Sequence, residues 1–264
     1  MEQSQLLTNR RIDLNLCHID AIKMSEAIEQ IRTLARSSAF HYVVTPNIDH
    51  LQRLYKAGAK SEICDIYRNA SLSLCDSRIL EKLMELSGAR VPQVVTGSDL
   101  TRRMFDEVLK PGSRLFIVGG SAALIDRLRN LYPYLQIEHV NPSMGFIKRS
   151  AEVCSVVDAV CAAKPEFILL AVGSPQQEIL ARKLAASAKS GVALCIGASL
   201  LFITGEEKRA PEWLQTLRCE WLYRLSQCPR RMAKRYLLNM LHLPFIAHAI
   251  RKEVHGDGRK GAHV

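Results

Sequence analysis

Short apolar runs alternate with longer helical segments through residues 1–203, and this alternation leaves few architectures open to the chain. The runs lie at 42–44, 72–74, 115–118, 167–172 and 192–196. Continuous runs of this length, rich in β-branched residues, are typical of strands buried on both faces of a parallel sheet. Between them, apolar residues recur every three or four positions, which indicates helices. We therefore predict an α/β fold of the Rossmann-like type, with a mainly parallel sheet flanked by helices.

The net charge of +10 is concentrated near the C-terminus. Residues 204–264 hold 12 Lys and Arg against 6 Asp and Glu, so less than a quarter of the chain carries more than half of the excess. We therefore expect an α/β catalytic domain at 1–204, a basic amphipathic helical appendage at 205–253 and a disordered tail at 254–264. A basic excess of this kind indicates an anionic partner, such as a nucleic acid, a lipid surface or a phosphorylated substrate.

The sequence predicts a cytoplasmic protein bound peripherally to the inner face of the plasma membrane. There is no secretory signal, no apolar run of 18 residues, and no CxxC pair among eight cysteines, which we expect to be reduced and buried. In the appendage, aromatic residues such as Trp213 and Trp221 are interleaved with Lys and Arg, and the apolar segment 236–250 follows. This pattern suits an anionic membrane surface.

Five predicted strand exits combine glycine or turn-forming residues with polar side chains, and each opens a predicted helix. In parallel sheets ligands bind beyond the carboxyl ends of the strands. Glycine lets the backbone approach a ligand closely and helix N-termini favour anions, so a diphosphate is the expected ligand. Each exit alone resembles an ordinary turn, but five at one edge favour a binding site. They are Thr45–Asp49, Cys75–Arg78, Gly119–Ser121, Gly173–Glu178 and Gly197–Ser199.

Asp76 is the carboxylate best placed for catalysis. It follows a buried strand and would take a proton from a substrate hydroxyl, although a cap on the helix near Arg78 is an equally good interpretation. Thr45 and Asn47 offer neutral hydrogen bonds, and Asn47 equally suits a helix N-cap. We expect Asp99 to cap another helix.

Several chemistries are excluded by missing motifs. The chain has no GxGxxG fingerprint, no GxxxxGK[ST] loop, no HExxH and no GxSxG. We therefore expect no metal site and no cofactor. No helix-turn-helix or RNA-recognition signature is present either, so nucleic acid is not an expected partner.

The motifs together resemble the WecG/TagA/CpsF family, glycosyltransferase family 26, over about residues 12–238. The pairing of Gly173-Ser174-Pro175-Gln176-Gln177-Glu178 with the later tryptophan motifs is highly specific. The stretches that carry the resemblance are Thr45–Asn47 with Asp49 and His50, Asp76, Val95–Leu100, Val118–Gly120, Gly173–Glu178, Lys208–Trp213, Glu220–Leu225 and Pro229–Arg231.

The resemblance implies a metal-independent, inverting enzyme of bacterial surface-polysaccharide assembly. Such enzymes move a sugar from a UDP-sugar to a polyprenyl-diphosphate-linked sugar. Glucose, N-acetylmannosamine and its uronic acid are all possible donor sugars. The resemblance implies Asp76 as general base with Thr45 and Asn47, Gln177 at the substrates, and Arg224, Arg231 and Lys234 or Arg235 around the diphosphate. From the strand exits and the basic segment we add Gly119, Gly120, Gly173, Ser174, Glu178 and Arg209 as substrate-binding residues.

One departure from the family is Ser77, where the family usually has glycine after the aspartate. The added side chain close to the sugar site implies a different sugar or a different loop geometry. Two other functions stay open at this point: a membrane-bound scaffold of a polysaccharide assembly complex with an inactive sugar site, and a basic nucleic-acid-binding protein. A homo-oligomer is also possible.

Overall fold

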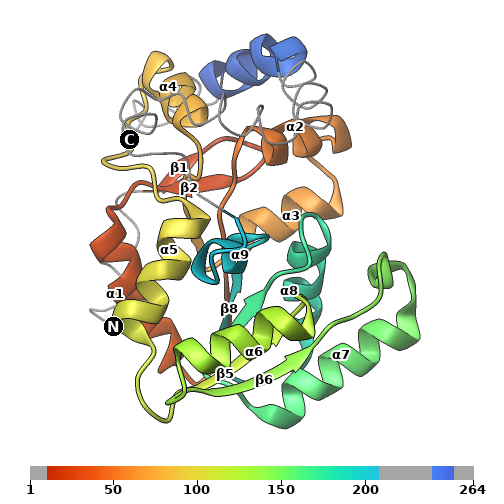
Figure 1. The fold of residues 1–264 in the computed structure, drawn as a ribbon. Coiled ribbons are helices and arrows are strands. Elements are labelled where there is room, and N and C mark those ends of the chain that lie inside the picture. Colours follow the sequence, from red (N-terminus) through yellow and green to blue (C-terminus); the bar gives the residue numbers. More distant parts are fainter. Residues whose placement is uncertain (1–10, 208–239, 253–264) are drawn as a thin grey trace.

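The computed structural model describes residues 11–207 and 240–252. Its centre is a six-stranded sheet with strand order β4-β3-β8-β7-β5-β6, in which every neighbouring pair is parallel (Figure 1). The predicted α/β fold is thus confirmed. The strands of this sheet are β3 (Phe40–Val44), β4 (Leu72–Ser73), β5 (Arg114–Val118), β6 (Gln136–Val140), β7 (Phe167–Leu170) and β8 (Gly191–Cys195). A separate antiparallel pair consists of β1 (Arg11–Asp13) and β2 (His18–Asp20).

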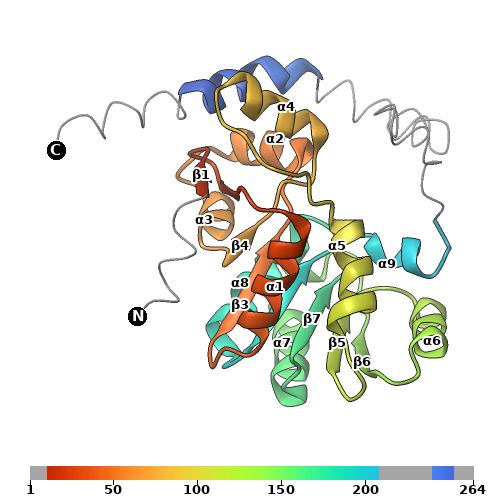
Figure 2. The same cartoon turned by 90° about the vertical axis from the view of Figure 1, so that its left-hand side faces the viewer.

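Helices cover both faces of the sheet (Figures 1 and 2). Along β3, Tyr42 and Val44 contribute to one hydrophobic cluster and Val43 to the other, because successive side chains point to opposite faces. The first cluster includes α2 (Ile48–Ala57), α3 (Glu62–Arg68), α4 (Arg78–Leu86), α7 (Ser150–Ala163) and α8 (Gln176–Ser187). The second includes α1 (Met24–Ala35), α5 (Gly97–Arg103), the π-helical turn Met104–Val108, α6 (Ala122–Leu131) and α9 (Ser199–Ile203).

The chain reverses its winding direction between β5 and β7, which lie side by side. From β5 it passes through α6 to β6 at the edge of the sheet, whereas from β7 it passes through α8 to β8 on the other side. Because α6 and α8 pack on opposite faces, the two exits diverge. Such a switch point is where open α/β sheets bind ligands.

A helix over residues 240–252 packs on the body of the α/β domain, beside α2 and α4 (Figure 2). Ile246 and Ile250 are almost fully buried and belong to the first cluster. His242 lies 3.0 Å from the side chain of Gln52, and Phe245 stacks on Tyr55 with ring centroids 6.4 Å apart. The apolar face of this segment therefore lies against protein, while Met240 and Leu241 remain exposed.

Candidate functional site

Three strand exits meet around Gly97, the first residue of α5. A Cβ atom at position 97 would lie 3.3 Å from Thr45 Oγ1, 3.6 Å from Ser199 Oγ and 3.8 Å from Asp76 Oδ2. These side chains follow β3, β8 and β4, which are neighbours in the sheet. The absence of a side chain at Gly97 keeps open the space between one carboxylate and two hydroxyls. Sequence reasoning placed Gly97 only in a helix start, because close approach between distant segments leaves no local signal.

The half-buried Asp76 is held by its backbone, whose N–H donates to the Pro46 carbonyl at 3.0 Å. This bond ties the exit of β4 to the exit of β3. The N-cap of α4 is Ser77, whose hydroxyl accepts from the N–H of Leu80 at 3.2 Å. The capping interpretation of Asp76 is therefore wrong, because the next residue fills that place. Burial raises the pKa of the adjacent Cys75 thiol to about 12, so this thiol stays protonated and is no competing nucleophile.

Thr45 and Asn47 both follow β3 but make different hydrogen bonds. Thr45 is buried, and its hydroxyl donates weakly to the Cys195 carbonyl at 3.4 Å. The Asn47 side chain accepts from the backbone N–H groups of Asp49 and His50 and so caps α2, which was one of its two predicted roles.

The prediction that Asp99 caps a helix is wrong, because Thr96, three residues earlier, is the N-cap of α5. The Thr96 side chain accepts from the Asp99 N–H at 3.1 Å and donates to the Asp99 carboxylate at 2.7 Å. Asp99 is thus the hydrogen-bond partner of the N-cap threonine, and its negative charge in the first turn interacts favourably with the helix dipole.

The glycine-rich exits lie at the switch point. Gly119 and Gly120 follow β5 with φ of +96° and +89°, and Gly173 follows β7 with φ of +75°. A Cβ on Gly119 would lie 2.8 Å from the Ala171 carbonyl oxygen, so only glycine fits there. Beside Gly173, the hydroxyl of Ser174 accepts from the guanidinium of Arg53 at 2.6 Å. Sequence reasoning missed this cation, because Arg53 lies in the second turn of α2, away from any strand exit.

Gln177 and Glu178 are buried beneath the exits of β7 and β8, with 2% and 1% of their surface exposed. The Gln177 amide donates to Glu178 Oε1 at 2.8 Å, and Gln177 Oε1 accepts from the N–H of Gly197 at 2.9 Å. Their side chains therefore bind the protein in this structure. The four arginines expected around the diphosphate, Arg209, Arg224, Arg231 and Arg235, lie outside the described residues.

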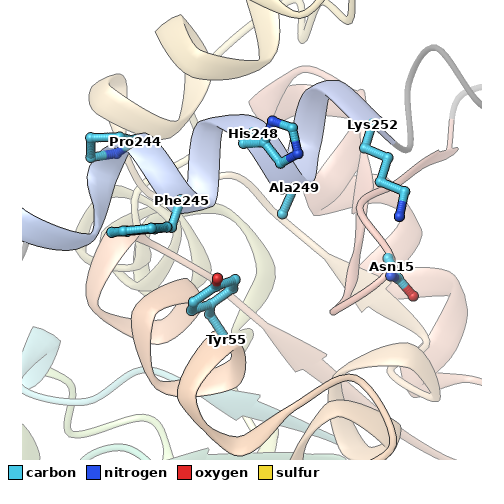
Figure 3. Close-up of a pocket in the computed structure, with 7 residues that line it drawn as sticks. All are labelled: Asn15, Tyr55, Pro244, Phe245, His248, Ala249 and Lys252. Carbon is cyan, nitrogen blue, oxygen red and sulfur yellow. The ribbon is translucent and has the colours of Figure 1, made fainter.

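A cavity of about 570 Å³ lies elsewhere, between the helix at 240–252 and the body of the protein (Figure 3). The stacked rings of Tyr55 and Phe245 lie toward one end of it, and Asn15 and Lys252 lie at its other end. None of the side chains around Gly97 lines this cavity. Within residues 11–207 and 240–252, no cluster of three or more His, Cys, Asp or Glu side chains suits a metal ion.

The fold and the site define a Rossmann-like α/β protein whose carboxyl edge combines one carboxylate with glycine-rich, anion-compatible turns. Its sequence matches the model of the glycosyl transferase WecG/TagA/CpsF family over residues 12–257, and the chain belongs to that family. The chain is similar to the N-acetylglucosaminyldiphosphoundecaprenol N-acetyl-beta-D-mannosaminyltransferase of Bacillus spizizenii strain W23, with 27% identity over 191 residues. The aligned region covers 71% of this chain and 70% of the relative. In the described part of the chain, no helix has the length and apolar character needed to cross a bilayer.

Proposed function

We propose that this protein is an inverting, metal-independent hexosyltransferase that moves a sugar from a UDP-sugar to a polyprenyl-diphosphate-linked sugar in surface-polysaccharide assembly. The observation that carries the proposal is the convergence of Asp76, Thr45 and Ser199 around Gly97 in a member of this family. The name of the Bacillus relative favours N-acetylmannosamine as the sugar and a polyprenyl-diphosphate-linked N-acetylglucosamine as the acceptor.

In this mechanism Asp76 takes the proton of the acceptor hydroxyl as that oxygen attacks the anomeric carbon of the donor. The new carbon–oxygen bond forms as the bond to the UDP oxygen breaks, so UDP leaves with the bonding electrons and the anomeric configuration inverts. Negative charge then accumulates on the diphosphate. The glycine turns after β5 and β7 let a diphosphate approach the backbone closely, and the nearby Arg53 supplies positive charge at the described edge of the sheet. We assign Arg209, Arg224, Arg231 and Arg235 to the same task.

We further propose that the protein binds the anionic inner leaflet of the membrane peripherally through its C-terminal region. Support comes from Met240, Leu241 and Phe245, which expose apolar surface on the helix at 240–252, and from Ile79 and Leu86 on α4 beside it (Figure 2). Flotation with anionic and with neutral vesicles tests this proposal. Anionic vesicles should carry the wild-type protein, and the double variant Met240→Gln/Leu241→Gln should bind less; equal binding to both vesicles, or no effect of the variant, contradicts it.

A donor screen tests the transferase proposal. Purified protein is incubated with detergent-dispersed polyprenyl-diphosphate-linked N-acetylglucosamine or glucose and a panel of UDP-sugars, beginning with UDP-N-acetylmannosamine, while UDP release and glycolipid mass are followed. We expect acceptor-dependent UDP release that is lost in Asp76→Asn and preserved in the exposed control Glu29→Gln. Full turnover by Asp76→Asn refutes the assignment of the base. Absence of turnover with every pair refutes the proposed substrates and favours the scaffold alternative.

A further inference from the structure

A buried cluster of polar side chains lies behind the site. It joins Glu178 of α8 to His50 of α2 and to Tyr67 of α3, two helices that follow β3 in the chain. The rings of His50 and Tyr67 have centroids 6.1 Å apart. Glu178 Oε2 and His50 Nδ1 are buried and have no hydrogen-bond partner among the described residues, whereas the Tyr67 hydroxyl interacts with that of Ser174. An unpartnered polar atom in the interior is costly, so two in one cluster call for a function.

The cluster contacts two segments that border the site, the exit of β3 and the exit of β8. The His50 imidazole donates to the backbone carbonyl of Thr45, which fixes the exit of β3. On the other side Glu178 orients the Gln177 amide, and Gln177 holds the N–H of Gly197 at the exit of β8. Both exits border the space around Gly97. Neither His50 nor Glu178 is among the three side chains nearest to a Cβ at Gly97.

Electrostatics couple the two residues. Burial lowers the pKa of His50, while the Glu178 carboxylate raises it and Arg53, on the same helix, lowers it further. The same carboxylate adds to the effect of burial in raising the pKa of Tyr67 well above its usual value, and the Ser174 hydroxyl opposes that rise.

We propose that Glu178 and His50 are a pair of positioning residues that hold the loops of Gly197 and Thr45 at the separation the transfer reaction needs. This inference rests on the proposed function, because it assigns the pair a part in that reaction. Neither residue touches the reacting atoms. Their contribution is to fix the hydroxyl of Thr45 and the turn before Ser199 relative to Asp76, and misplacing such groups by about 1 Å costs roughly 10²-fold in rate.

Two substitutions separate positioning from packing. In Glu178→Gln the amide oxygen still accepts from the Gln177 amide, while the carboxylate charge is removed. Glu178→Ala removes this hydrogen bond as well. We expect kcat of Glu178→Ala to fall by about 10- to 100-fold with KM changed less than about threefold, and Glu178→Gln to keep at least about a third of kcat. Assays run well below each variant's thermal midpoint, and Glu29→Gln on exposed α1 is the matched control.

Nitrogen NMR of the His50 ring supplies a readout that does not depend on turnover. The bond to Thr45 places a proton on Nε2, because the unpartnered nitrogen is Nδ1, and the pKa lowered by burial favours the ring that carries only this proton. Removing the charge of Glu178 should shift the His50 titration to lower pH in Glu178→Gln and leave it unchanged in Glu29→Gln.

An unshifted titration overturns the coupling, and full kcat in Glu178→Ala overturns the positioning role. Loss of kcat in Glu178→Gln equal to that in Glu178→Ala overturns the hydrogen-bond explanation. If the wild type transfers no sugar, the proposed function fails while the NMR result still decides whether the pair exists.

Discussion

Replacing Gly97 by alanine tests the geometry of the site with little effect on folding. Gly97 is the first residue of α5 after the Thr96 cap, and its backbone lies outside the left-handed region that favours glycine. Alanine is favoured over glycine in helices by up to about 1 kcal/mol. The added methyl group would lie 3.3 Å from Thr45 Oγ1, so that hydroxyl must shift by a few tenths of an ångström. These effects oppose each other, and we expect a thermal midpoint within about 5 °C of the wild type.

The effect on turnover should be much larger. The methyl carbon would also lie 3.6 Å from Ser199 Oγ and 3.8 Å from Asp76 Oδ2, so it fills the space in which an acceptor hydroxyl meets the base. An acceptor displaced by about 1 Å loses roughly 10²-fold in kcat/KM. The assay is acceptor-dependent UDP release, with Ser150→Ala at the exposed first residue of α7 as the control. Wild-type kcat/KM in Gly97→Ala would refute the placement of the reacting atoms around Gly97.

Four further predictions follow from the described contacts. Asp76→Asn should lower kcat by roughly 10²- to 10⁴-fold without changing the thermal midpoint, as expected for loss of a general base; unchanged kcat contradicts this. Ser77→Ala removes the cap of α4 and should cost about 1 kcal/mol in urea unfolding, whereas a purely sugar-contacting role predicts no cost. Ile246→Ala should lower the free energy of unfolding by about 2–5 kcal/mol because the side chain is fully buried. An unchanged free energy of unfolding of the α/β domain would show that the helix at 240–252 is independent of the core. Because burial lowers the pKa of His50, the unfolded state binds more protons than the folded state below pH 6.5. The free energy of unfolding should therefore fall as the pH drops below 6.5, and it should fall less steeply in His50→Gln. Equal dependence on pH in the wild type and the variant refutes this prediction.

The central strands were predictable because their burial leaves a strong local signal. The runs at 115–118 and 167–172 correspond to β5 and β7, which are covered on both faces and therefore need apolar residues at every position. The edge strand β6 was missed, since its outer position lets Gln136 and Glu138 face solvent and leaves no continuous apolar run. The pair β1–β2 escaped too, because three-residue strands are too short for a recognisable alternation.

The positions of the site residues along the chain were predictable, but their surroundings were not. Strand exits placed Thr45 and Asp76 at one edge, and the parallel sheet brings them together. The sequence does not distinguish a helix-opening Glu178 that faces a substrate from one that faces the interior, because both occupy the first turn of a helix. That distinction depends on His50 and Tyr67, which come from helices more than 100 residues earlier in the chain.

The order of the strands also determines how far apart the exits of β4, β7 and β5 lie along the edge of the sheet. Asp76 follows the edge strand β4, whereas Gly173 and Gly119 follow β7 and β5, three and four strands away. At about 4.8 Å per strand, a ligand that reaches both ends must extend roughly 14–19 Å along the edge of the sheet. A free monosaccharide is far shorter than this, whereas a nucleoside diphosphate sugar arranges a base, a ribose, two phosphates and a sugar in a row. The span between these strand exits therefore matches the length of the nucleotide-linked sugar proposed as the donor and exceeds that of a free sugar.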